Sequence, residues 1–166
     1  GGGIEPQVAF TRDGERLISA SESGVVLTDA ESCATIARVD GKLLEISVEH
    51  DLIVVGGETF MQLRNTLDGS VVWALNQGMT HAAISPDGTR LLCWGETDGD
   101  IHDFDVVSGA PVGLFGRPQQ GLRSNRLSFT RDGSGVMIFD TASYEDIPLF
   151  GARLCNAADG TVMASF

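Results

Sequence analysis

Three histidines are the first residues in this chain whose chemistry could support catalysis or metal binding. His50, His81 and His102 do not belong to a nucleophile-elbow, zinc-protease or phosphate-loop pattern. His50 precedes an aspartate at an expected turn, and the other two histidines lie in expected strands. The sequence therefore predicts no catalytic residue, no metal ligand and no cofactor site.

A run of acidic residues suggests calcium, which takes several oxygen ligands from one tight loop. These acids pass from a loop into an expected strand, where successive side chains point to opposite faces, and EF-hand spacing is absent. The alternative is structural, with Asp98 in a turn, and it is the interpretation that we favour. The run consists of Glu96, Asp98, Asp100, Asp103 and Asp105.

Arginines cluster in the longest expected connection, residues 117–126, and a polar insert follows at residues 141–146. Long loops on rigid scaffolds often carry binding, and arginine is enriched at interface hot spots. We therefore name four partner-binding candidates, with a solvated loop balanced by neighbouring acids as the alternative. The candidates are Arg117, Arg123, Arg126 and Tyr144.

Charge and composition limit the kinds of partner that this chain can bind. The 166 residues carry a formal net charge of −12, which argues against nucleic acid as a partner because phosphate binding needs a basic surface. No apolar run approaches the ~20 residues of a membrane helix, so we expect no membrane contact. The three cysteines lack metal-ligand spacing and indicate a reducing compartment. With no secretory start at residue 1, a cytoplasmic location is expected.

The strands and turns that must position these residues follow one pattern, which occurs four times along the chain. Each copy reads strand, Asp-Gly turn, strand, loop, strand, second turn, strand, and no helical stripe interrupts the copies. Asp13 and Asp87 are 74 positions apart, which is two units of 37. Because aspartate and glycine suit tight hairpin turns, Asp13, Asp87 and Asp132 are predicted to have structural roles. The fold class is all-β.

The second turn of each copy shows the same chemistry with one exception. Asp68-Gly69, Ser108-Gly109 and Asp159-Gly160 fill it in copies two to four. Copy one has Ser32-Cys33 at this place. Because cysteine lacks the conformational freedom of glycine, we expect a strained turn or one of another type.

Copy three resembles a repeat of the WD-repeat (WD40-like) family. Residues 85–92 look like the start of a blade and residues 98–109 like its end, with Phe104-Asp105 where the family has Trp-Asp. The family's Trp is absent throughout, as is its Gly-His pair, so the resemblance is to a divergent member. It implies that Asp105 caps a backbone turn. Residues 67–73 and 158–162 resemble quinoprotein-type propellers more weakly.

The resemblance implies a β-propeller made of four four-stranded antiparallel blades in a single unit. The expected blades span approximately residues 7–40, 43–76, 79–116 and 126–166. The chain would then be a piece of a longer propeller, one of two chains that pair into a homodimeric larger ring, or a closed four-blade unit.

The function implied is a non-enzymatic scaffold that binds a protein or peptide partner through its loop face. The alternatives are a propeller-type enzyme, either a metal-dependent hydrolase or a quinone-dependent oxidoreductase, and a purely architectural blade-association unit. The same fold hosts many unrelated activities, so the sequence does not name the partner.

Overall fold

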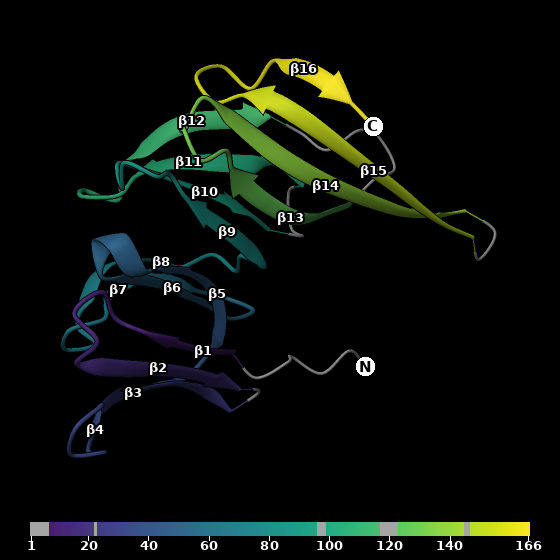
Figure 1. Cartoon of the computed structure of the whole chain (residues 1–166). Coiled ribbons are helices and arrows are strands. Elements are labelled where there is room, and N and C mark those ends of the chain that lie inside the picture. The colour runs from purple at the N-terminus through teal and green to yellow at the C-terminus, as the bar shows by residue number, and fades with distance from the viewer. Residues whose placement is uncertain (1–6, 22, 96–98, 117–122, 145–146) are drawn as a thin grey trace. The chain divides into compact units, whose positions relative to one another are not determined.

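Each of the four sequence copies forms one four-stranded antiparallel sheet in the computed structural model of the chain (Figure 1). We call these sheets blades 1 to 4 in chain order. The structure describes residues 7–21, 23–95, 99–116, 123–144 and 147–166, and within these the side chains of residues 123–125, 140–144 and 147–150 are outside the description. The chain divides into two compact units, Gly1–Met79 and Thr80–Phe166. The first unit holds blades 1 and 2, and the second holds blades 3 and 4.

In the first unit, both blades are meanders whose strands pair in sequence order. A 3-10 helix, η1 (Val48–His50), lies between the first two strands of blade 2. Blade 1 consists of β1 (Gln7–Phe10), β2 (Arg16–Ser21), β3 (Gly24–Asp29) and β4 (Thr35–Val39). Blade 2 consists of β5 (Lys42–Ser47), β6 (Leu52–Gly56), β7 (Met61–Asn65) and β8 (Val71–Leu75).

The second unit repeats this plan with longer strands at its C-terminal end. Two strands of blade 4 have ten residues each and form a long hairpin (Figure 1). Blade 3 consists of β9 (His81–Ile84), β10 (Arg90–Trp94), β11 (Ile101–Asp105) and β12 (Pro111–Gly116). Blade 4 consists of β13 (Arg123–Phe129), β14 (Gly135–Tyr144), β15 (Ile147–Asn156) and β16 (Val162–Ser165).

Glycines with positive φ close the turns, as the Asp-Gly pattern predicts. Gly69, Gly109 and Gly160 have φ of 74°, 69° and 71° in the second turns of blades 2, 3 and 4. Cys33 stands at the same place in blade 1 with φ of 58°, a left-handed conformation that costs a non-glycine residue energy. The turn is therefore of the same type as the others and is strained, which was one of the two expected outcomes.

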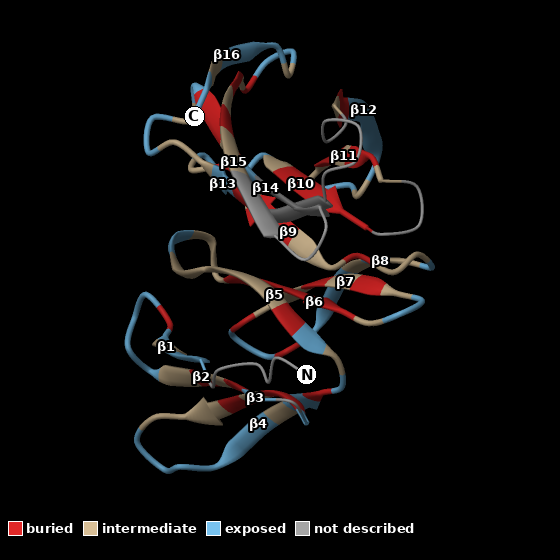
Figure 2. Ribbon diagram, turned by 90° about the vertical axis from the view of Figure 1, so that its right-hand side faces the viewer, coloured by how far each residue is buried: buried red, intermediate tan, exposed pale blue. Residues whose placement is uncertain are grey.

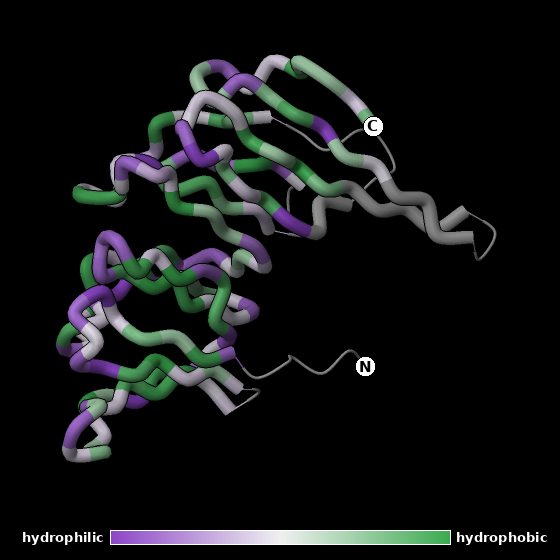
Figure 3. The backbone as a smooth tube through the Cα atoms, viewed as in Figure 1, coloured by the Kyte–Doolittle hydropathy of each residue, from purple (hydrophilic) through white to green (hydrophobic). Residues whose placement is uncertain are grey.

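Each unit is held together by an apolar layer between its two blades. In blade 1, Ile18 and Ala20 of β2 lie on the face that packs against blade 2, which contributes Ile53 and Val55 of β6. We call the face that carries the third and fifth residues of a blade's second strand its trailing face, and the face that carries the second and fourth residues its leading face. Hydrophobic residues follow the strands and hydrophilic residues gather at the turns (Figure 3).

The same layer recurs between blades 3 and 4. Leu92 and Trp94 on the trailing face of blade 3 pack with Val136 and Ile138 on the leading face of blade 4. The second and third strands of the blades carry most buried residues, whereas the fourth strands β4, β12 and β16 are largely exposed (Figure 2). The all-β class with four four-stranded antiparallel blades is thus confirmed.

One expectation about blade 4 was wrong. The polar insert was expected as a loop, but Thr141 to Tyr144 extend β14 and pair with β15 up to Tyr144↔Ile147. Similarly, β13 begins at Arg123 rather than after residue 126. Once two antiparallel strands are in register, each further pair adds ladder bonds, so polar residues with fair β propensity continue the strands.

Candidate functional site

The Asp-Gly turn between β9 and β10 is held by a compact hydrogen-bond network. The Ser85 hydroxyl donates to Asp87 Oδ1 over 2.6 Å, and the Thr89 amide donates to the same oxygen over 3.1 Å. The Arg90 amide in turn donates to Ser85 Oγ over 2.9 Å. These bonds favour the ionised carboxyl, so the pKa of Asp87 lies below its usual range, chiefly because of the Ser85 hydroxyl.

Blade 4 repeats this turn between β13 and β14. The Thr130 hydroxyl donates to Asp132 Oδ1 over 2.6 Å, and the Ser134 amide and hydroxyl donate to the same atom over 3.1 and 2.9 Å. The Thr130 bond is the largest cause that lowers the pKa of Asp132 to about 2. Asp132 is therefore a carboxylate at any physiological pH.

A cavity of about 390 Å³ lies between these two turns. The structure thus brings together two of the aspartates that the sequence marked as structural, and adds a guanidinium and a phenyl ring. The cavity is lined by Ser85, Pro86, Asp87, Arg90, Phe129, Asp132 and Gly133.

Arg90 fixes one wall of this cavity and joins the two blades. Its Nη2 lies 2.6 Å from Asp103 Oδ2, and the Asp103 side chain is only 6% exposed. A second guanidinium nitrogen, Nη1, donates to the carbonyl oxygen of Ala157 in the second turn of blade 4. The guanidinium also lies over the Phe115 ring, 5.9 Å from its centroid. Arg90 is therefore a bridge between blades 3 and 4.

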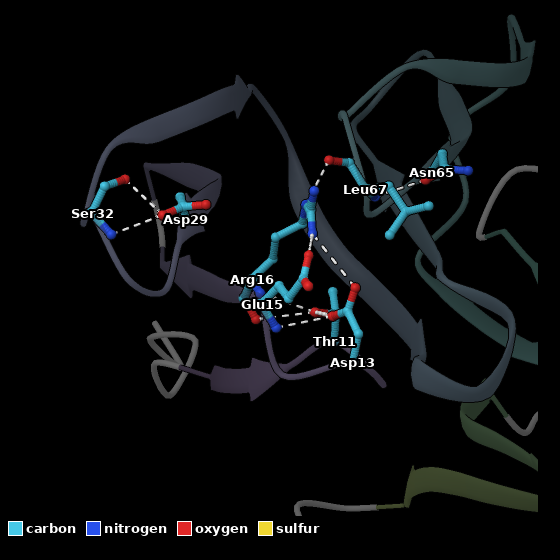
Figure 4. Close-up of polar contacts among 8 residues, drawn as sticks. All are labelled: Thr11, Asp13, Glu15, Arg16, Asp29, Ser32, Asn65 and Leu67. Atoms are coloured by element: carbon cyan, nitrogen blue, oxygen red, sulfur yellow. Dashed lines mark hydrogen bonds and ion pairs between the residues drawn. The ribbon is translucent and has the colours of Figure 1, made fainter.

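The same bridge occurs between blades 1 and 2 (Figure 4). Arg16 Nε donates to the Leu67 carbonyl over 2.9 Å, and its Nη1 lies 3.1 Å from Glu15 and 3.5 Å from Asp13. The Thr11 hydroxyl bonds Asp13 Oδ1 as Ser85 bonds Asp87. The sequence signal for the bridge is an arginine three residues after the turn aspartate, 74 positions apart, and sequence analysis missed it. Blades 2 and 4 have Leu52 and Gly135 there, which offer no side-chain donor.

The cavity is suited to binding rather than to proton transfer. Asp132 cannot donate a proton near neutral pH because its pKa is about 2. Ser85 and Thr89 donate to Asp87 through Oδ1, so Oδ2 can accept from an N–H group of a ligand. Arg90 is already engaged by Asp103 and Ala157. The arrangement can hold a polar or cationic group beside an aromatic ring.

The residues predicted for partner binding are only partly covered by the description. Arg117 lies outside the described residues. Arg123 begins β13, and its backbone pairs with Thr141; Arg126 lies in the same strand, is exposed and stands opposite Phe139. Tyr144 ends β14, opposite Ile147. The topology therefore places Arg123 and Tyr144 toward the same end of blade 4, away from the cavity.

Outside the cavity, the predicted structural aspartates and the acidic run have these positions. Asp105 Oδ1 accepts from the Ser108 amide over 2.8 Å at the second turn of blade 3. Asp103 pairs with Arg90, and Glu96 and Asp98 lie outside the described residues. Among the residues that the structure describes, no three His, Cys, Asp or Glu side chains gather as a metal site requires. In this same part of the chain, no helix is long and apolar enough to cross a membrane.

Because the fold favours the ionised form of the turn carboxyls, we predict that the folded chain loses stability in acid. In the unfolded chain Asp132 has its ordinary pKa of 3.8, and in the folded chain the pKa is about 2. Its contribution is therefore complete above about pH 4 and disappears as the pH falls through about 2. We expect Asp132→Asn to make the urea midpoint less dependent on pH between about 4 and 2. Thr130→Val removes the hydrogen bond that is the main cause of the low pKa of Asp132, so it should act in the same direction. An unaltered pH dependence of the urea midpoint in both variants would contradict the role given to Asp132.

Comparison with known proteins finds similarity in structure alone. No family model and no curated protein matches this chain by sequence. The β-propeller domain of Cps50 (Swd1) from Myceliophteria thermophila superposes with a TM-score of 0.74 and 15% identity, over 100% of this chain and 56% of that one. Hydrazine synthase from Kuenenia stuttgartiensis superposes with a TM-score of 0.71 and 17% identity, over 95% of this chain and 52% of that one.

These likenesses concern the fold. Both matched chains are similar to this chain over its whole or nearly whole length, and the expected β-propeller fold is confirmed. The chain spans about half the length of the structures that it matches. One of these is a propeller domain and the other an enzyme, so the fold does not select an activity.

Proposed function

We propose that this chain is a non-enzymatic scaffold that binds a protein or peptide partner at the end of blade 4 formed by the β14–β15 hairpin. The observation that carries the proposal is the length of this hairpin. In the described part of the chain, residues 142–144 and 147–149 pair only with one another, because β13 reaches β14 as far as Thr141 and β16 reaches β15 as far as Arg153. Among the described residues, no third strand lies along the outer edges of this part of the hairpin.

Unpaired strand edges bind extended peptides by adding a strand, and backbone hydrogen bonds supply the affinity. Arg123 stands where the projecting part of the hairpin begins, opposite Thr141. Arg126, which is exposed in the same strand, would add charge-assisted contacts to the partner in a chain that is otherwise acidic. Likeness to a propeller domain of Swd1 is compatible with this role but does not identify the partner.

The test compares the proteins captured by wild-type chain and by two variants. In the first variant, residues 142–149 are replaced by Asn-Gly, which closes a two-residue hairpin between Thr141 and Phe150. In the second, Arg126 is replaced by alanine, and Arg131→Ala is the matched control because Arg131 is exposed in the turn at the opposite end of blade 4. We expect partners that wild type and Arg131→Ala retain to be lost from the shortened hairpin and weakened by Arg126→Ala. Identical partners for all four proteins would contradict the proposal.

The enzyme alternative has its own readout. A metal-dependent hydrolase or quinone-dependent oxidoreductase would be purified with bound metal or with a cofactor that absorbs light. Elemental analysis and an absorbance spectrum of the purified chain are expected to show neither. A stoichiometric metal or a cofactor band would replace the scaffold proposal with an enzymatic one.

A further inference from the structure

The leading face of blade 1 is apolar and exposed, whereas the equivalent faces of blades 2 and 4 are covered. Val8 of β1 is 65% exposed. Its counterparts are Leu43 and Leu127, which are 5% and 4% exposed. Each of the three stands opposite the fourth residue of the second strand of its blade. Their side chains therefore point to the same face of equivalent sheets, and of these three described residues Val8 is the one that is left exposed.

The next position along the first strand shows the same contrast. Phe10 stands opposite Leu17 and is 56% exposed. Its counterparts Ile46 and Phe129 are both partly buried against the apolar layers of their units. Blade 1 thus carries on its leading face the kind of residues that blades 2 and 4 bury against a neighbouring blade.

Blade 4 has the complementary feature on its trailing face. Phe139 is the fifth residue of β14 and is 41% exposed, whereas the fifth residues of β2 and β10, Ala20 and Trp94, are both 4% exposed. Phe166 is 78% exposed and lies on the same face, because it exchanges backbone hydrogen bonds with Ala152, which stands opposite Phe139. Two exposed aromatic rings on one sheet face are unusual for a surface that contacts only water.

We propose that the leading face of blade 1 binds the trailing face of blade 4 in a second copy of this chain. These two faces are equivalent to the two faces that already pack together between blades 3 and 4. Inside the second unit, Trp94 on a trailing face packs into the apolar layer that holds Leu127 on a leading face. Phe139 and Val8 occupy the equivalent positions on the two uncovered faces. Each chain therefore presents one face of each kind, and the two kinds fit each other by the packing that joins blades 3 and 4.

The contact is heterologous, since two different faces meet. Such contacts close into a ring when the rotation allows it and otherwise continue into a chain of copies. Blade 4 has Gly135 where blade 3 has the bridging Arg90, so this contact has no arginine bridge and depends on apolar burial. We therefore expect association that depends on protein concentration rather than a permanent complex.

The experiment is sedimentation of the 166-residue chain over a wide range of concentration. Wild type should pass from the mass of one chain toward that of two or more. Two variants should each raise the protein concentration at which half of the chains are associated by at least about tenfold. The leading-face variant is Val8→Glu with Phe10→Glu, and the trailing-face variant is Phe139→Glu with Phe166→Glu. Val107→Glu is the control, because Val107 is 81% exposed in a turn of blade 3, and it should behave as wild type.

Mixing the two variants separates this contact from any symmetric one. A leading-face variant keeps an intact trailing face, and a trailing-face variant keeps an intact leading face. Neither variant should associate alone, but an equimolar mixture should form a pair through one restored contact. If either variant alone still associates like wild type, or if the mixture stays monomeric, the proposed pairing is overturned.

Two further outcomes are decisive. Wild-type chain that is monomeric at every concentration overturns the proposal outright. If the glutamate variants do not fold, as judged by circular dichroism, Val8→Cys and Phe139→Cys are introduced into separate chains with Cys33→Ser, which removes the exposed native thiol. A disulfide between the two chains on mild oxidation supports the contact, and cross-linking no greater than for Val107→Cys paired with Phe139→Cys opposes it.

Discussion

Replacing Arg90 with alanine is expected to destabilise the second unit by about 3 kcal/mol. The change leaves the Asp103 carboxylate, whose side chain is 6% exposed, without its guanidinium partner at 2.6 Å. It also removes the hydrogen bond to the Ala157 carbonyl, which ties blade 3 to blade 4. This loss of stability lies at the lower end of the range for breaking a buried ion pair, because the Arg90 side chain is itself 26% exposed. Urea denaturation followed by circular dichroism measures it.

Arg16→Ala is the matched control for this prediction. Arg16 makes the same bridge in the first unit, but the side chains of its acidic partners Asp13 and Glu15 are 41% and 70% exposed. Water replaces an exposed partner at little cost, so the loss should be clearly smaller. In addition, Arg90→Met with Asp103→Leu should recover much of the stability, because an apolar pair leaves no buried charge. Equal losses for Arg16→Ala and Arg90→Ala would contradict our account of Asp103.

Replacing Gly160 with alanine is expected to cost about 4 kcal/mol or to prevent folding of the second unit. Gly160 has φ of 71°, which alanine adopts only with strain. A Cβ atom there would also collide with the backbone carbonyl oxygen of Phe115 in β12. Backbone cannot rotate away as a side chain can, so blade 4 must move relative to blade 3. Thermal unfolding by circular dichroism measures the effect.

Gly133→Ala isolates the conformational part of this cost. Gly133 has φ of 72° in the first turn of the same blade, and its Cβ would meet only Pro86 Cδ at an ordinary 3.7 Å. This substitution should therefore cost only about 1 kcal/mol. Should Gly160→Ala prove no worse than Gly133→Ala, the close approach of the blade 4 turn to Phe115 would not be a determinant of blade packing.

Much of the fold could be predicted from the sequence because its signals are local. Asp13-Gly14 and Asp87-Gly88 specify tight turns through their own backbone preferences, whatever surrounds them. Strain at Cys33 was one of two expected outcomes, because its counterparts in the other copies are glycines, and its φ of 58° confirms it. The extent of β14 and β15 was not predictable, because residues 141–144 show no alternation of apolar and polar residues and pair only once the register is set.

The candidate site could be predicted only in part. The turn aspartates Asp87 and Asp132 were recognised, but the cavity between their turns depends on how blade 4 packs on blade 3. Arg90 was missed because an arginine that starts a strand is unremarkable until its partners are known. Asp103 is 13 positions away in the chain and Ala157 is 67 positions away. No local rule relates residues at those separations.

The sequence by itself determined the all-β class, the four copies and the chemistry of their turns, because these follow from alternation of apolar residues and from backbone conformations that individual residues prefer. Only the tertiary structure decided which faces are covered. Val8 and Leu127 are both apolar residues of a first strand, yet one is 65% exposed and the other 4%. The difference arises because burial depends on a neighbouring sheet, and the identity of that neighbour is not encoded within the strand.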